Sequence, residues 1–180
     1  MNALTEQLLE TLWDGDPTFG EVESRLKEQC RSMSAAEAAV IGRDLLLRRH
    51  ALHTKIFKLA AFLASDGTAG NDGFMDFTDC VALLPEERYQ RIVNNPDELA
   101  ADPVSTNFEE CYLVSEVCSV FDCALLEEDG DDELLLYLVL GEDEIDWSGM
   151  DSATEADAAQ FLPRLHSKSG HLLSLPKPSR

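Results

Sequence analysis

The 180-residue chain is predicted to have an all-α fold, with a single compact multi-helix domain over residues 1–166 and a short, loosely held C-terminal tail over residues 167–180. Three observations support this prediction. Apolar residues recur at the three- and four-residue spacing that lines one face of a helix. Ser34, followed three residues later by Glu37, has the form of a capping box at a helix start. A hydrophobic content of 44% in a chain of this length is enough for one buried core.

The N-terminal third is predicted to contain two short helices and one long one. Residues 3–14 and 19–30 are amphipathic, and Gly15-Asp16-Pro17 separates them. Residues 34–65 contain no proline and favour a helix throughout, with a possible kink near His50. Its buried stripe is predicted to consist of Ile41, Leu45, Leu52, Ile56, Leu59 and Leu63.

A glycine-rich loop is predicted over residues 65–73, followed by further helices over residues 74–84, 85–93, 96–101, 108–125 and 151–162. The loop has neither the glycine order nor the Lys-Ser/Thr pair of a phosphate-binding loop. Residues 108–125 are apolar nearly all round, so we expect that helix to be central. Residues 134–140 form an apolar run that fits either a buried strand or two turns of buried helix, and the helical surroundings favour the helix.

The charge is strongly negative and unevenly distributed. Lys and Arg number 14 against 35 Asp and Glu, and between Arg91 and Arg164 there are 20 acidic residues and no basic one. Such a chain is not expected to bind nucleic acid or an anionic membrane unaided, because both need positive side chains. We expect a basic protein partner, or acidity that serves only solubility. The basic strip over residues 43–58 is expected to pair with the acidic half of the same chain rather than to bind phosphate.

Few residues support chemistry at an active site. His50 and His53 lie one helical turn apart, but no third metal ligand follows at helical spacing, so we expect a capping or surface role for them. Cys118 and Cys123 are predicted to lie on an apolar helix face, which raises a thiol pKa and makes a poor nucleophile. The five cysteines are expected to be reduced and mostly buried. The predicted protein is therefore not an enzyme and needs no cofactor or metal.

The chain has neither an apolar run of membrane-spanning length nor a basic region ahead of an apolar one at its start, where Glu6 and Glu10 stand. We therefore expect a cytoplasmic protein without membrane contact.

Several short stretches resemble one bacterial family. The residues that carry the resemblance are Gly70, Asp72, Gly73, Phe74 and Phe77, then Tyr89, the run 96–102, Glu110, Tyr112, Glu116 and the run 161–165. They resemble an all-helical family of unknown function with a Gly-x-Asp-Gly-Phe-x-x-Phe signature, found in toxin and immunity neighbourhoods and sometimes with WGR domains. The resemblance covers most of residues 35–166. It implies a helical fold without an established enzymatic activity.

Two functions are predicted. The first is an immunity protein, or antitoxin, that occludes a bacterial toxin domain acting on nucleic acid or a nucleotide, because a positive toxin cleft complements an acidic surface. Trp147 would serve as its apolar anchor, and the acidic partner-binding residues would be Asp129, Asp131, Asp132, Glu133, Glu142, Asp143, Glu144 and Asp146. The alternative is an acidic adaptor or metabolic regulator that holds a peptide or small ligand at the loop containing Asp72, Gly73 and Phe74.

Overall fold

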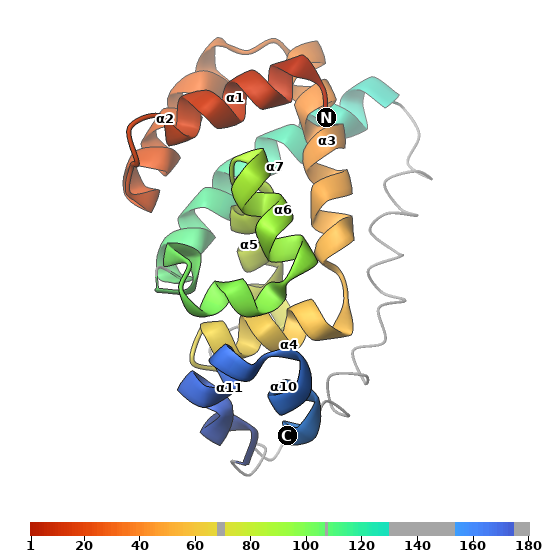
Figure 1. Ribbon diagram of the computed structural model, residues 1–180. Helices are drawn as coiled ribbons and strands as arrows, with labels where there is room; N and C mark the ends of the chain where they lie inside the picture. Colours follow the sequence, from red (N-terminus) through yellow and green to blue (C-terminus); the bar gives the residue numbers. More distant parts are fainter. Residues whose placement is uncertain (68–70, 107, 130–153, 175–180) are drawn as a thin grey trace.

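The computed structural model describes residues 1–67, 71–106, 108–129 and 154–174, and within these ranges every regular element is helical. The predicted all-α fold is confirmed. In Figure 1, α1 (Ala3–Trp13) and α2 (Phe19–Ser32) lie at one end of the molecule. The long helix α3 (Ala35–Leu52) runs from there toward α4 (Lys55–Ala64).

The connection between α1 and α2 is fixed by polar contacts at the helix ends. The Arg25 guanidinium donates to the carbonyl oxygens of Leu12 and Asp14 at 3.0 and 2.7 Å, which satisfies acceptors that the end of α1 leaves open. The Trp13 indole N–H donates to the Leu83 carbonyl oxygen at 2.7 Å. The Arg25 bonds tie α2 to the end of α1, and the Trp13 bond ties α1 to a segment seventy residues further along the chain.

The predicted kink is a break between two helices. α3 begins at the predicted capping box, with Ser34 and Glu37 bonded reciprocally, and ends at its C-cap residue His53. Thr54 then caps α4 through its side-chain oxygen, which accepts from the Phe57 N–H at 3.1 Å. The chain thereby changes direction without proline or glycine, because a capping threonine follows the last turn of α3.

The predicted glycine-rich loop is shorter than the sequence indicated. α5 (Asn71–Ala82) already begins at Asn71, so Asp72, Gly73 and Phe74 belong to a helix rather than to a loop. Phe74 is buried, with its ring centroid 6.2 Å from that of Phe57. Burial of aromatic surface outweighs the low helix propensity of the glycine.

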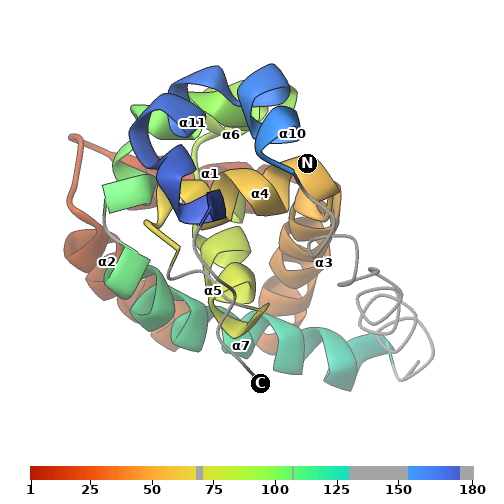
Figure 2. The ribbon, with the colours of Figure 1, turned by 90° about the horizontal axis from the view of Figure 1, so that it is seen from below.

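The next elements are α6 (Glu86–Asn94), the short 3-10 helices η1 (Pro96–Ala100) and η2 (Pro103–Thr106), and then α7 (Phe108–Asp129). α7 packs most extensively on α3, and also on α5 and α2. Figure 2 shows α2 and α7 side by side along one edge of the molecule. The crossing of α3 with α7 is close at Gly42, where a Cβ atom would lie 2.6 Å from the Phe121 carbonyl oxygen.

The C-terminal helices are α10 (Glu155–Phe161), α11 (Pro163–Ser169) and the 3-10 helix η3 (Gly170–Ser174). Helical structure continues beyond residue 167, where the loose tail was predicted to begin, as far as Ser174, and Ser169 is fully buried. The buried Asp97 carboxylate accepts from the backbone N–H groups of Arg164 and Leu165 at 2.9–3.0 Å and so caps α11 from η1. Residues 134–140 lie outside the described residues.

Candidate functional site

A cluster of polar side chains joins α3, α5 and α7, which pack on one another. Arg49 of α3 donates to Asp79 of α5 at 3.0 Å and to both carboxylate oxygens of Asp122 on α7, at 3.1 and 2.5 Å. The Ser115 hydroxyl of α7 donates to the second Asp79 oxygen at 2.6 Å. One guanidinium thus bridges α5 and α7, each of which also packs directly on α3.

Burial shifts the protonation of this cluster. Desolvation raises the pKa of Asp79 to about 6, although Arg49 and the hydrogen bond from Ser115 act in the opposite direction. The pKa of Arg49 is raised by its two carboxylate partners, which outweigh its own desolvation. The neighbouring Cys118 is buried, and desolvation raises its thiol pKa well above the usual value.

The central cluster has no room for a ligand. The space bordered by Leu45, Arg49, Asp79, Cys118 and Asp122 does not admit a water molecule. A substrate or cofactor needs a concave site with free volume. We therefore assign these residues to the stability of the helix packing, and Cys118 is shielded as the sequence indicated.

The basic residues of the described ranges are largely engaged with acids of the same chain. The predicted pairing of the basic strip with the acidic half of the chain is confirmed for Arg49, through Asp122, and for Lys55 at the 4.0 Å limit, whereas Arg48 pairs with Glu86, which precedes the acidic interval. The ion pairs are Lys27–Glu23, Arg48–Glu86, Arg49–Asp79, Arg49–Asp122, Lys55–Asp157, Arg88–Asp102, Arg91–Asp102 and Arg164–Glu98. Little cationic charge is left to offset the excess of acidic side chains.

A second group of residues with shifted pKa values lies where α3, α4 and α5 meet. The His53 ring lies 5.7 Å from that of Phe74, and the Lys58 ammonium nitrogen lies 5.4 Å from the centroid of the same ring. Desolvation, first among several causes, lowers the pKa of His53 to about 4, and it lowers that of Lys58 to about 8. His53 occupies the C-cap position of α3, where its backbone N–H donates to the His50 carbonyl oxygen.

This arrangement bears on the alternative ligand site. Phe74 is 1% exposed and contributes to the core, so its side chain is not presented to a ligand at the surface. Gly73 lies in the first turn of α5, and the side chain of Asp72 lies outside the described ones. No contact within the described part of the chain favours the adaptor prediction.

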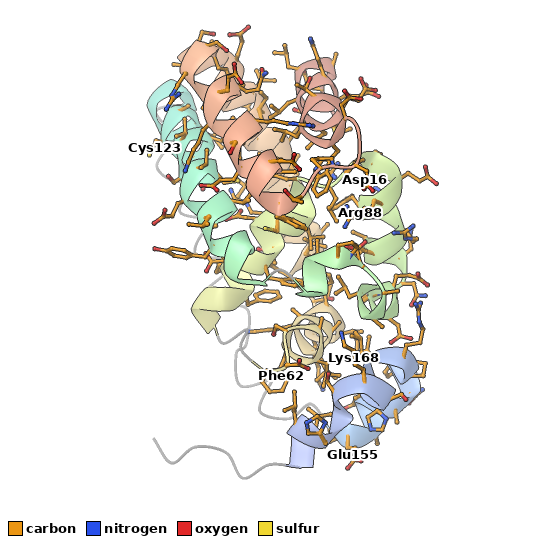
Figure 3. All side chains as sticks on the ribbon, turned by 90° about the vertical axis from the view of Figure 1, so that its left-hand side faces the viewer. Asp16, Phe62, Arg88, Cys123, Glu155 and Lys168 are labelled. Carbon is orange, nitrogen blue, oxygen red and sulfur yellow. The ribbon has the colours of Figure 1, made fainter. Side chains whose placement is uncertain are left out.

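The outward side of α7 is unusual for a helix expected to be central. Tyr112, Leu113 and Val120 are 53%, 41% and 44% exposed. Cys123 is exposed as well, which corrects the prediction that it lies buried on an apolar face (Figure 3). The helix covers α2, α3 and α5 with one side only, and the other side faces outward.

A groove of about 310 Å³ runs beside this outward side. Its α7 wall is formed by Ser119, Val120, Cys123 and Ala124. The opposite wall is formed by the end of α2, the connection and the start of α3, with Cys30, Met33, Ser34, Ala35 and Ala38. Most of these side chains are apolar or small. The groove is therefore open and apolar, next to a helix that carries seven acidic and no basic residues.

The predicted partner-binding residues fall almost entirely outside the described part of the chain. Asp129 is the last residue of α7. Asp131, Asp132, Glu133, Glu142, Asp143, Glu144, Asp146 and Trp147 lie within the undescribed residues 130–153. α7 leads directly into this acidic segment of the sequence.

Neither the central cluster nor the groove could be recognised from the sequence. Arg49 and its carboxylate partners are 30 and 73 residues apart in the chain, and the surplus of acids gave no means of choosing among them. One signal was present. Arg48 and Arg49 interrupt the apolar stripe between Leu45 and Leu52, and a base at such a position needs a nearby carboxylate when it is buried.

Comparisons with protein-family models, with curated proteins and with solved structures found no match. Among the described residues, no group of three or more His, Cys, Asp and Glu side chains is placed to hold a metal ion. Within the same ranges, no helix has the length and hydropathy needed to cross a membrane.

Proposed function

We propose that this protein is an immunity protein: a non-catalytic, acidic binding protein that occludes a basic toxin domain acting on nucleic acid or a nucleotide. The observation that carries the proposal is that the basic side chains are largely engaged in ion pairs within the chain. The arginines of the described ranges mainly serve internal ion pairs, while α7 and the sequence that follows it as far as residue 163 contain acidic residues and no Lys or Arg. A protein built in this way presents a negative field to its surroundings.

The class of partner follows from this field. An enzyme that acts on a polyanion or a nucleotide needs a positive cleft, and an acidic protein fills that cleft while excluding the substrate. The predicted binding residues are the acidic group from Asp129 to Asp146, with Trp147 as an anchor. The resemblance to a family from toxin and immunity neighbourhoods supports the same direction.

The test begins with co-purification of the tagged chain from its native cytoplasm, followed by mass spectrometry and purification of any stoichiometric basic partner. The association rate of the purified pair is then measured from about 50 to about 500 mM salt. Electrostatic steering predicts a fall in the rate of tenfold or more over that range. One equivalent of the chain should also abolish the partner's hydrolytic activity. A salt-independent rate, or a partner that stays active in the complex, would refute the proposal.

Charge reversal locates the surface. The test variant replaces four acids of the proposed site by lysine, at Asp131, Asp132, Glu142 and Asp143. The matched control reverses four exposed acids elsewhere, at Glu6, Glu10, Glu28 and Glu87. The first variant should slow association far more than the control, although both change the net charge equally. Equal slowing would mean that net charge alone, and no particular surface, attracts the partner.

A further inference from the structure

The outward side of α7 combines apolar and acidic side chains in one sector of the helix. At 100° per residue, its exposed positions fall within about 120° of the helix circumference. We call this sector the α7 docking face, and it consists of Tyr112, Leu113, Glu116, Ser119, Val120 and Cys123. From first to last residue the face is about 16 Å long, or roughly three helical turns.

The groove beside this face makes it a concave rather than a flat surface. Val120 and Cys123 belong to both the face and the groove, and Met33 and Ala38 line the opposite wall. Adjacent exposed apolar side chains with a groove between two helices are typical of sites that receive the apolar side of a third helix. Such a helix would place side chains three or four residues apart into the groove.

The charge on α7 indicates which polar side chains such a third helix would carry. The sequence of α7 contains seven acids and no base; of the two whose side chains the structure describes, Glu116 is exposed on the docking face and Asp122 bonds to Arg49 on the side facing the core. The C-terminal end of α7 adds the negative end of the helix dipole. Arg31 follows the groove residue Cys30 on α2 and is the basic side chain nearest to it in sequence. The balance favours a cationic occupant.

We propose that the α7 docking face binds a basic amphipathic helix of the partner protein, with its apolar side in the groove and its Lys and Arg side chains toward the acids of α7. The inference rests on the proposed function and adds a second, apolar contact to it. A second copy of this chain is a poorer occupant, because each copy carries a net charge of −21.

The probe is a fluorescein-labelled synthetic helix of 14 residues, composed only of Leu and Lys in amphipathic order. Its control is a peptide of the same composition in scrambled order, and binding is followed by fluorescence anisotropy. Val120→Asp removes an apolar contact while adding a negative charge, so a loss of affinity cannot come from electrostatics. Leu47→Asp is the matched control, because Leu47 is 56% exposed on α3 and does not line the groove.

The amphipathic peptide should bind at least tenfold more tightly than the scrambled one. Val120→Asp should weaken it about tenfold or more, and Leu47→Asp should leave its affinity unchanged. Equal affinity of the two peptides, or equal effects of the two substitutions, would overturn the docking face while leaving the acidic surface intact. Failure of both peptides to bind even at low salt would instead argue against the proposed function.

Two further measurements address other occupants. Cys123 of the free chain should react with a maleimide rapidly, the amphipathic peptide should protect it, and the buried Cys118 should react only after unfolding. Slow labelling of Cys123 in the free chain would mean that the face is already covered and would overturn the inference. Sedimentation equilibrium should give a monomer. A dimer dissociated by Val120→Asp would assign the face to a second copy instead.

Discussion

The central ion-pair cluster allows a quantitative test of what holds α3, α5 and α7 together. Arg49→Met keeps much of the apolar stem of the side chain and removes the guanidinium. Asp79, which is 7% exposed, then retains the Ser115 hydroxyl as its charge-neutral donor, and Asp122 loses both of its bonds to Arg49. The carboxylates of Asp79 and Asp122 then remain close together without the cation that paired with both.

The expected cost follows from burial. Removing one partner of a buried ion pair costs about 3–5 kcal/mol, because the remaining charge is left without compensation. For a protein of this size, this corresponds to a fall in Tm of roughly 10 °C. Asp79→Asn in the Arg49→Met background should recover part of the loss, because it removes the buried charge.

The loss should depend on pH. Burial raises the pKa of folded Asp79 from 3.8 to about 6, so the stabilisation from its protonated form is complete below pH 3.8 and is lost as pH rises through 6. Arg49 lowers that pKa in the wild type, and its removal widens the window. The loss of stability in Arg49→Met should therefore be larger at pH 7.5 than at pH 4.5. At pH 4.5, Asp79 is mostly protonated in the folded state of both the wild type and the variant.

Urea unfolding followed by far-ultraviolet circular dichroism measures these free energies in one cooperative transition. Arg31→Met, at an exposed position of α2, is the matched control and should change stability by less than about 0.5 kcal/mol. A deficit below about 1 kcal/mol for Arg49→Met at pH 7.5, or the same deficit at both pH values, would refute the reasoning.

Three further predictions concern other parts of the fold. Gly42→Ala should destabilise the protein by about 1–3 kcal/mol, because its Cβ would lie 2.6 Å from the Phe121 carbonyl oxygen. The control Gly20→Ala, with open space around it, should leave the stability unchanged or raise it by up to about 1 kcal/mol. Thermal unfolding of the two variants measures this difference, and similar values would contradict the close crossing of α3 and α7. Burial lowers the pKa of His53 from 6.5 to about 4, so its contribution is present above pH 6.5 and is lost as pH falls toward 4. His53→Asn should reduce the loss of stability between pH 7.5 and pH 4.5, because asparagine does not titrate, and an unchanged pH profile in urea titrations would count against the shift. Ser34→Ala should cost about 1 kcal/mol in the same titrations by opening the capping box of α3, and no loss would mean that water replaces the cap.

The fold class and most helices could be predicted because they depend on local patterns. The capping box at Ser34 and the spacing of Ile41 and Leu45 define α3 within the sequence itself. The cysteines that the structure describes are free, as predicted, but only Cys80 and Cys118 of these four are buried. The beginning of α5 could not be predicted, because Gly73 reads as a loop residue until the burial of Phe74 is known.

The candidate site likewise has features that the sequence predicts and features that only the tertiary structure shows. The acidic interval and its expected preference for a basic partner come from composition alone. The exposed side of α7, where we propose a docking face, could be recognised only in the tertiary structure, since the apolar pattern of α7 indicates only that the helix is buried, not on which side. Val120 and Cys123 are exposed because α2, α3 and α5 cover the other side of the helix.

The sequence by itself determined the helical fold class, the negative charge and the helix caps, because each depends on neighbours within a few residues or on a sum over the chain. Only the tertiary structure decided that Arg49 pairs with Asp79 and Asp122, that Gly42 allows α7 to cross α3, and which side of α7 is exposed. The physical reason is that these contacts join residues 30 to 79 positions apart, and their partners are selected by packing geometry and desolvation, which no local pattern encodes.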